Sequence, residues 1–317
     1  VPGNPLLLPP PNGLGPIFSQ YQVVQVTPAL VYDMTDRLSI SVSPLLNIGM
    51  AQLDPAVFAD PLSPPAPPAI GPYPSGTHSS SVWGGGYSVG AYYRGNVWDF
   101  GASYKSKQWF ESYEFNSFDT VNNVPITLGL DLDLPSIISL GTSYKGFERW
   151  LFAADVRYVD FTNTGALGNS GYTPAGALRG VGMENVFAIS FGAQYRLTNA
   201  LTLRGGYSWN ENPIPNSQSS ANVASPLIIQ NTITAGATYQ VTDAFNISLA
   251  YMHGFENSIS GPIVHPIAGP LPGTTVTNNA SVDSIIFGAV VKFGCPRCRI
   301  AVPPQQSCQA PPPSHPL

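Results

Sequence analysis

Four basic side chains lie on strand-like segments where each could bind an anion. They are Lys105, Lys107, Arg157 and Arg204. A carboxylate that leaves water must find a cation or several hydrogen-bond donors. These four residues are therefore our candidates for binding the head group of an anionic ligand. The alternative is that each cation pairs with a carboxylate of its own wall and only stiffens the protein; the carboxylates available for this are Asp131, Asp133 and Asp155.

The four cations share the polar side of segments in which apolar and polar residues alternate. Successive side chains of a strand point to opposite faces. Around Arg204, one face carries Leu201, Leu203, Gly205, Tyr207 and Trp209, and the other carries Thr202, Arg204, Gly206, Ser208 and Asn210. Segments 98–107, 150–158 and 186–197 divide in the same way. In a membrane the apolar face must point to lipid, because a charge there at mid-depth costs about 2–4 kcal/mol. The cations are then expected to face a lumen.

Eleven strand-like segments supply the wall that this alternation requires. Most are long enough to cross a bilayer as tilted strands, which takes about 9–11 residues. Tight turns alternate with long loops rich in Pro, Gly, Asn and Ser, as they do at the two ends of an outer-membrane barrel. We therefore predict an all-β fold, an antiparallel transmembrane β-barrel. Its strands are expected at about 21–33, 38–51, 81–93, 97–111, 130–145, 149–162, 185–197, 201–212, 227–241, 245–256 and 281–293. A soluble β-sandwich or propeller is the alternative, but its core would not place Tyr and Trp at both strand ends.

The composition supports a membrane barrel and argues against several other classes. Only 10% of the 317 residues are charged, against about a quarter in soluble domains. The sequence contains no run of about 18 apolar residues, so a transmembrane helix is not expected. The net charge is -5 and the basic residues are dispersed, which gives nucleic-acid binding no support.

The number of segments predicts that part of the barrel is missing. Eleven is odd, so the first and last strands run parallel, whereas bacterial single-chain barrels close with an even number. An open edge in lipid leaves backbone groups unpaired, at several kcal/mol each. We therefore expect an odd number of strands upstream of Val1, unless one strand has been miscounted. The first residues also lack the basic start and apolar core of a signal peptide, so we expect a mature, truncated or fragmentary chain.

The chain divides into three regions. Residues 1–20 are a loop rich in Pro and Gly, residues 21–293 hold the barrel strands and the long extracellular loops, and residues 294–317 form a Pro-rich periplasmic tail. All three cysteines, Cys295, Cys298 and Cys308, lie in this tail. A disulfide between the first two or a flexible tether fits their irregular spacing better than a zinc site. We expect no metal and no cofactor.

Several stretches of the sequence carry a resemblance through their order and spacing. They are Trp83-Gly-Gly-Gly-Tyr-Ser-Val-Gly-Ala-Tyr-Tyr93, Gly101-Ala-Ser-Tyr-Lys-Ser-Lys107, Leu134-Pro-Ser-Ile-Ile-Ser-Leu-Gly141, Ala153-Ala-Asp-Val-Arg-Tyr158, Leu203-Arg-Gly-Gly-Tyr-Ser-Trp-Asn-Glu-Asn-Pro213, Tyr251-Met-His-Gly254 and Ile286-Phe-Gly-Ala-Val-Val-Lys-Phe293. In these stretches the sequence resembles the FadL/TodX (OMPP1) family of outer-membrane transporters for long-chain fatty acids and aromatic hydrocarbons. The resemblance covers about residues 16–293.

The resemblance implies a barrel of fourteen strands with an N-terminal plug, so that this chain would lack the plug and three strands. It also implies passive, ligand-gated diffusion of hydrophobic compounds, such as long-chain fatty acids, across the outer membrane of a Gram-negative-type bacterium. Apolar extracellular loops would form a first capture groove, for which Leu53, Phe58 and Leu62 are our candidates. The expected partners are outer-membrane lipid, the hydrophobic substrate and the barrel-assembly machinery, and the protein is expected to be a monomer.

Two other functions compete with this interpretation. A non-specific porin for small polar solutes would share the polar lumen. An outer-membrane lipid hydrolase would need Ser, His and an acid on one lumen face. His253 is the histidine that lies on a strand-like segment, and its position matches the lipid-facing Leu249 and Tyr251. We therefore expect no enzymatic activity.

Overall fold

A computed structural model describes the protein at residues 6, 10, 13–65, 69, 71–77 and 79–292. Nearly all regular structure in these residues is antiparallel β-strand. The described helices are one short α-helix, α1 (Gly165–Gly168), and a 3-10 turn, η2 (Asn216–Gln218). No helix in this part of the chain has the length and apolar character needed to cross a membrane. The tail 294–317, with Cys295, Cys298 and Cys308, lies outside the described residues.

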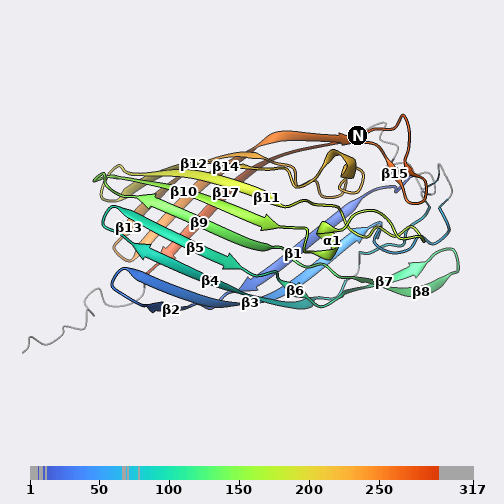
Figure 1. The fold of residues 1–317 in the computed structure, drawn as a ribbon, viewed down its shortest axis with the longest axis horizontal. Helices are drawn as coiled ribbons and strands as arrows, with labels where there is room; N and C mark the ends of the chain where they lie inside the picture. Colours follow the sequence, from blue (N-terminus) through green and yellow to red (C-terminus); the bar gives the residue numbers. More distant parts are fainter. Residues whose placement is uncertain are drawn as a thin grey trace, which may run out of the picture.

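One large sheet forms the wall of the protein. Its path connects β1 (Phe18–Val26), β3 (Leu38–Asp54), β4 (Val82–Arg94), β5 (Trp98–Lys105), β9 (Ser136–Tyr144), β10 (Trp150–Asp160), β11 (Val186–Arg196), β12 (Leu201–Asn210), β13 (Asn231–Thr242), β14 (Phe245–Gly261) and β17 (Val276–Val291). Strands that follow one another along this path are antiparallel neighbours, and each predicted segment overlaps one of them. In Figure 1, β13, β14 and β17 pass behind β4, β5 and β9, so the sheet curls round. In the described residues β1 and β17 do not pair with each other, so the sheet is not closed. The total of fourteen strands and the missing plug stay predictions.

The two ends of the curled sheet differ as the sequence predicted. Short turns join the strands at one end, whereas α1, β7 (Tyr113–Asp119), β8 (Val124–Leu130) and β15 (Val264–His265) all lie at the other end (Figure 1). Three small clusters of buried apolar residues occupy the loop end, and their buried members include Leu6, Ile263, Tyr113, Phe115 and Ile214. The loop end is therefore packed, although it was expected to consist of long loops.

Segment 97–111 is not one continuous strand, which corrects the sequence interpretation. Lys105 pairs with Ser88, but in β6 (Trp109–Phe110) the register against β4 has moved by one residue, because Trp109 pairs with Gly85. An extra residue of this kind is a β-bulge, and it breaks the alternation of faces. The argument that placed Lys107 on the face of Lys105 therefore does not hold beyond the bulge.

Three further segments differ from expectation. Segment 21–33 is interrupted at Thr27–Ala29, where Pro28 has no N–H to donate, and it resumes as β2 (Leu30–Asp33) in the same register on β3. Segment 112–129 is not a plain loop, because β7 (Tyr113–Asp119) and β8 (Val124–Leu130) pair as a separate hairpin. β14 and β17 also continue further toward the loop end than expected, to Gly261 and from Val276.

The outward face of the wall is apolar, as the alternation predicted. Large apolar side chains on this face are exposed, among them Phe100, Trp150, Phe152, Phe191, Leu203 and Tyr207. The opposite face carries small and polar residues in register across the sheet, such as Gly101, Gly141, Asp155 and Ser190. Side chains of this size leave the interior open, which matters for the hollows described below.

Candidate functional site

An apolar chamber of about 290 Å³ lies under the loops at the loop end. Its wall combines the ends of β1 and β3 with parts of four long loops. The apolar lining includes Leu53, Val57, Phe58, Leu130, Leu132, Phe161, Leu167, Leu178, Val181, Met183 and Leu227. Polar atoms enter the lining at Ser19, Gln20, Tyr21, Asn222 and Ser225. A cavity of this size and character can hold a small hydrophobic molecule, because ligand pockets are mostly apolar with few polar groups.

The base of the chamber is held by an aromatic cluster around the β7–β8 hairpin. Tyr113 and Phe115 are fully buried, and the ring of Phe58 lies 5.1 Å from that of Phe115. Gly49 of β3 makes this possible, because a Cβ at that position would lie 2.1 Å from the hydroxyl oxygen of Tyr113. The hairpin therefore seats its buried face on a glycine of the wall and supports Phe58 beside the chamber.

Hydrogen bonds between loops hold the roof of the chamber. The backbone N–H of Leu178 donates to the carbonyl of Val57 at 2.7 Å. The hydroxyl of Tyr73 donates to the carbonyl of Gly176 at 2.8 Å, and the side chain of Asn222 donates to the carbonyl of Val181 at 2.7 Å. These bonds join segments that are far apart in the sequence, so the roof is one connected structure rather than separate loops.

Arg179 is the charged residue of the chamber, and the sequence interpretation missed it. Among the described residues that line the chamber, it alone carries a charge. Its side chain is exposed and makes no hydrogen bond or ion pair with any described residue, whereas its backbone N–H donates to Gly171. Arg179 lies in a loop without strand periodicity, so no pattern marked it. The signal that could have found it is its isolation, as a single cation in the long apolar and polar segment 161–183.

Two of the four predicted cations have carboxylate partners. The Nζ of Lys107 lies 2.8 Å from Asp133, and it also donates to the carbonyl of Asn163 at 3.1 Å. The Nε of Arg157 lies 3.3 Å from Asp155 on the same strand. Asp133 and Asp155 are two of the carboxylates that the sequence offered as alternative partners for these cations. Both side chains therefore already have a partner within the protein. Ligand binding by them stays a prediction.

The other two predicted cations have neutral partners. Arg204 donates to Gln194 at 2.9 Å and to Thr238 at 2.6 Å, and it lines an interior hollow of about 600 Å³. Lys105 donates to Gln25 at 3.2 Å. The structure does not bring the four cations into one site, because Arg157 lines a different hollow, of about 580 Å³. Of the two predicted cations that line hollows, Arg204 is the one without a carboxylate partner among the described residues.

The predicted capture residues separate into two groups. Leu53 and Phe58 both line the chamber. Leu62 does not belong to its lining, and its backbone N–H instead donates to the carbonyl of Pro72 within the same loop. The chamber therefore brings together two of the three residues that the sequence suggested and adds Arg179.

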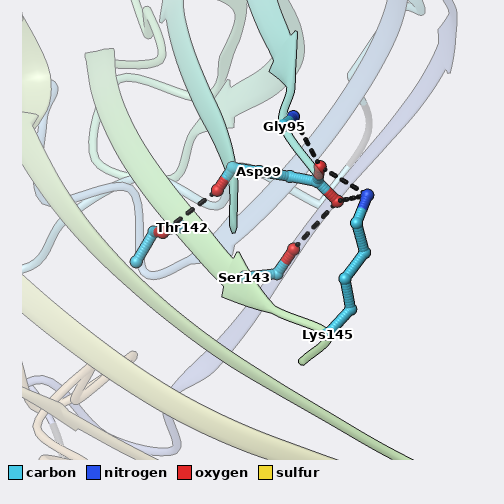
Figure 2. Close-up of polar contacts among 5 residues, drawn as sticks. All are labelled: Gly95, Asp99, Thr142, Ser143 and Lys145. Atoms are coloured by element: carbon cyan, nitrogen blue, oxygen red, sulfur yellow. Dashed lines mark hydrogen bonds and ion pairs between the residues drawn. The ribbon is translucent and has the colours of Figure 1, made fainter. Parts of the chain in front are cut away.

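A polar cluster braces the interior near the short-turn end. Asp99 is 6% exposed, and its carboxylate lies 2.8 Å from the Nζ of Lys145. The same carboxylate accepts hydrogen bonds from the backbone N–H of Gly95 at 3.1 Å and from the Ser143 hydroxyl at 3.5 Å (Figure 2). The hydroxyl of Thr142 donates to the backbone carbonyl of Asp99 (Figure 2). This cluster ties the β4–β5 turn to β9 and offers no free group for a ligand.

Comparisons with known proteins agree with this architecture. Residues 17–294 match a family model described as outer membrane protein transport protein (OMPP1/FadL/TodX). The fold is similar to that of the Pseudomonas putida toluene transporter TodX, with 16% identity over 87% of this chain and 70% of that one and a TM-score of 0.58. It is also similar to the Ralstonia pickettii toluene transporter TbuX, with 17% identity over 87% and 69% of the two chains and a TM-score of 0.55. A Pseudomonas aeruginosa FadL homologue also has a similar fold, with 16% identity over 86% of this chain and 68% of that one and a TM-score of 0.59. A search of curated proteins finds no match.

Proposed function

Because this chain belongs to the OMPP1/FadL/TodX family of outer membrane transport proteins, we propose that it carries small hydrophobic compounds through the chamber under its loops. The protein resides in the outer membrane of a Gram-negative bacterium. The observation that carries the proposal is the chamber itself, about 290 Å³ of mainly apolar space at the loop end. The transfer is passive and follows the concentration gradient of the compound.

The size of the chamber favours compounds smaller than a full long-chain fatty acid. Its volume lies at the lower end of the range for ligand pockets, about 300–1,000 Å³. Removing an apolar chain from water contributes about 0.8 kcal/mol for each CH₂ group. A monoaromatic ring or a medium-length chain can therefore be held by burial alone. TodX and TbuX, which share the fold, are named as toluene transporters.

Arg179 extends the proposal to hydrophobic acids. An unpaired guanidinium at an apolar wall is a good partner for a carboxylate, because it presents several donors in a fixed plane. A ligand with an apolar tail in the chamber could place its carboxylate at Arg179. Arg204 is the candidate for a second contact lower in the interior, since it faces a hollow and has no carboxylate partner among the described residues.

Uptake measurements in cells test the proposal. Gram-negative cells that produce the protein should take up radiolabelled toluene faster than cells that do not. Leu227→Glu places a carboxylate on an exposed part of the chamber wall and should slow this uptake. Val121→Glu alters an exposed residue between β7 and β8, outside the chamber lining, and should leave uptake unchanged.

Two outcomes would contradict the proposal. The first is equal toluene uptake with and without the protein. The second is sugar-driven swelling of liposomes that hold the purified protein, which would favour a non-specific porin. The members of the family are transport proteins, which supports a non-enzymatic role. The expected contacts with outer-membrane lipid and the barrel-assembly machinery, and the monomeric state, remain predictions.

A further inference from the structure

One polar side chain in the wall of the apolar chamber is buried. Asn222 is 2% exposed and lies in the loop between β12 and β13. The other polar or charged side chains of the described lining are exposed or half-buried, and they belong to Ser19, Gln20, Tyr21, Arg179 and Ser225. Water can reach these side chains from outside. The amide of Asn222 depends instead on the protein and on the contents of the chamber.

The hydrogen bonds of Asn222 fix the orientation of its amide. Nδ2 donates to the backbone carbonyl of Val181 at 2.7 Å and to that of Gln218 at 2.9 Å. Both partners are carbonyl oxygens, which can only accept, so the nitrogen of the amide must lie on their side. These two bonds use both N–H groups of Nδ2. Oδ1 therefore points away from Val181 and Gln218.

The Oδ1 atom of Asn222 has no donor, since no described residue donates a hydrogen bond to it. In the described part of the chain, the unpartnered side-chain atoms that are completely enclosed belong to Ser117, Asp155 and Asn246. Oδ1 of Asn222 is not one of them, so it borders an open space, and the space that Asn222 lines is the chamber. A buried acceptor without a hydrogen bond is unfavourable. A ligand that brings a donor into the chamber is therefore favoured.

The loop that carries Asn222 is anchored to two strands of the wall. The side chain of Asn278 in β17 donates to the carbonyl of Ser219 at 2.7 Å. Gly261 of β14 lets Asn216 approach closely, because a Cβ at this glycine would lie 1.9 Å from the carbonyl oxygen of Asn216. The acceptor is thus in place before a ligand arrives, so little ordering is needed when a ligand binds.

We propose that Asn222 is a specificity-determining residue, whose Oδ1 accepts a hydrogen bond from the hydroxyl of a neutral hydrophobic compound such as a monoaromatic phenol. The proposal names a substrate class for the chamber, and its meaning for transport rests on the proposed function. A phenol keeps its proton at neutral pH, because its pKa is about 10, as for tyrosine. A carboxylate has no proton to donate and would meet the lone pairs of Oδ1. Asn222 therefore favours neutral head groups, whereas Arg179 favours anionic ones.

Equilibrium dialysis with the purified full chain in detergent micelles tests the role of Asn222. The probes are 4-ethylphenol and 4-ethylanisole, which share the ring and differ in the hydroxyl proton. The binding of each probe is referred to its partition into protein-free micelles. The unchanged protein should prefer the phenol by about twofold to tenfold, which is the net contribution of one hydrogen bond. Asn222→Leu keeps the approximate size of the side chain but removes the acceptor, so the preference should disappear.

Tyr73→Phe is the matched control for a loosened roof. It removes the roof hydrogen bond to Gly176, as Asn222→Leu removes the one to Val181, but Tyr73 does not belong to the chamber lining. It should change the binding of both probes alike and leave the preference for the phenol intact. If Asn222→Leu does not fold, Asn222→Ala makes the same test with a smaller side chain.

The outcomes separate the role of Asn222 from the transport function. Equal binding of the two probes by the unchanged protein would overturn the proposal. So would a preference that survives the loss of Asn222, or one that disappears in Tyr73→Phe. Toluene uptake by cells with the unchanged protein is measured in parallel. Uptake without a preference for the phenol supports transport and removes the role of Asn222, whereas a preference without uptake supports that role and removes the proposed transport.

Discussion

Replacing Arg179 with methionine should separate charged from neutral ligands of the chamber. Methionine keeps the length and apolar contacts of the side chain and removes the charge. A hydrogen bond to a charged group contributes about 1.5–3 kcal/mol. Because Arg179 is exposed, water screens the contact and lowers its contribution below this range, to about 1–1.5 kcal/mol. Arg179→Met should therefore weaken the binding of decanoate about fivefold to tenfold and leave the binding of decanol unchanged.

Titration calorimetry with the purified protein in micelles measures both ligands under the same conditions. The charge contribution should also decrease between 0.1 M and 1 M salt, because the screening length falls from about 10 Å to about 3 Å. Arg149→Met is the matched control, since it removes an exposed cation at the short turn before β10 that does not line the chamber. An equal loss of binding affinity for decanoate and decanol in Arg179→Met would refute the reasoning. If decanoate binding weakened in Arg204→Met and not in Arg179→Met, Arg204 would bind the head group, as the sequence analysis suggested.

Two further substitutions test how the structure is held. Gly261→Ala would place a Cβ 1.9 Å from the backbone carbonyl oxygen of Asn216, and the forced shift should lower the free energy of unfolding by about 1–3 kcal/mol. Gly101→Ala is the control, because a Cβ there makes only an ordinary van der Waals contact. Urea unfolding in lipid vesicles should show a lower stability for Gly261→Ala than for Gly101→Ala. Equal stability of the two variants would contradict the clash at Gly261. Asp99→Asn should cost about 1–1.5 kcal/mol in the same assay, since Lys145 is one-third exposed and the pair is partly screened. Combining it with Lys145→Met should cost less than the sum of the two single changes, and strict additivity would show that the pair is not coupled.

The wall of the protein could be predicted because its signal is repeated along each strand. In β12, Leu203 and Tyr207 alternate with Arg204 and Ser208, and one face must be apolar if the strand meets lipid. The short turns then fix neighbouring strands as antiparallel pairs. The alternation fails between Lys105 and Trp109, where a bulge shifts the register, because a single extra residue leaves no mark in a polar sequence.

The chamber could be predicted only in part, because contacts between distant loops build it. Leu53 and Phe58 attracted notice as apolar residues in a polar, Pro-rich loop. Arg179 and Met183 come from another loop, and their place beside Phe58 depends on bonds such as that from Leu178 to Val57. Periodicity describes how one segment faces its surroundings, but it does not describe which loops meet.

The β7–β8 hairpin has a practical consequence for engineering. Its strands pair with each other and not with the large sheet, and its buried members, Tyr113 and Phe115, lie at its base. The tip around Val121 is exposed. A peptide epitope or an affinity tag inserted at Val121 would therefore leave the register of the wall unchanged. Because the loop end is predicted to be extracellular, such an insertion would display foreign sequences on living cells and allow the cells to be labelled from outside.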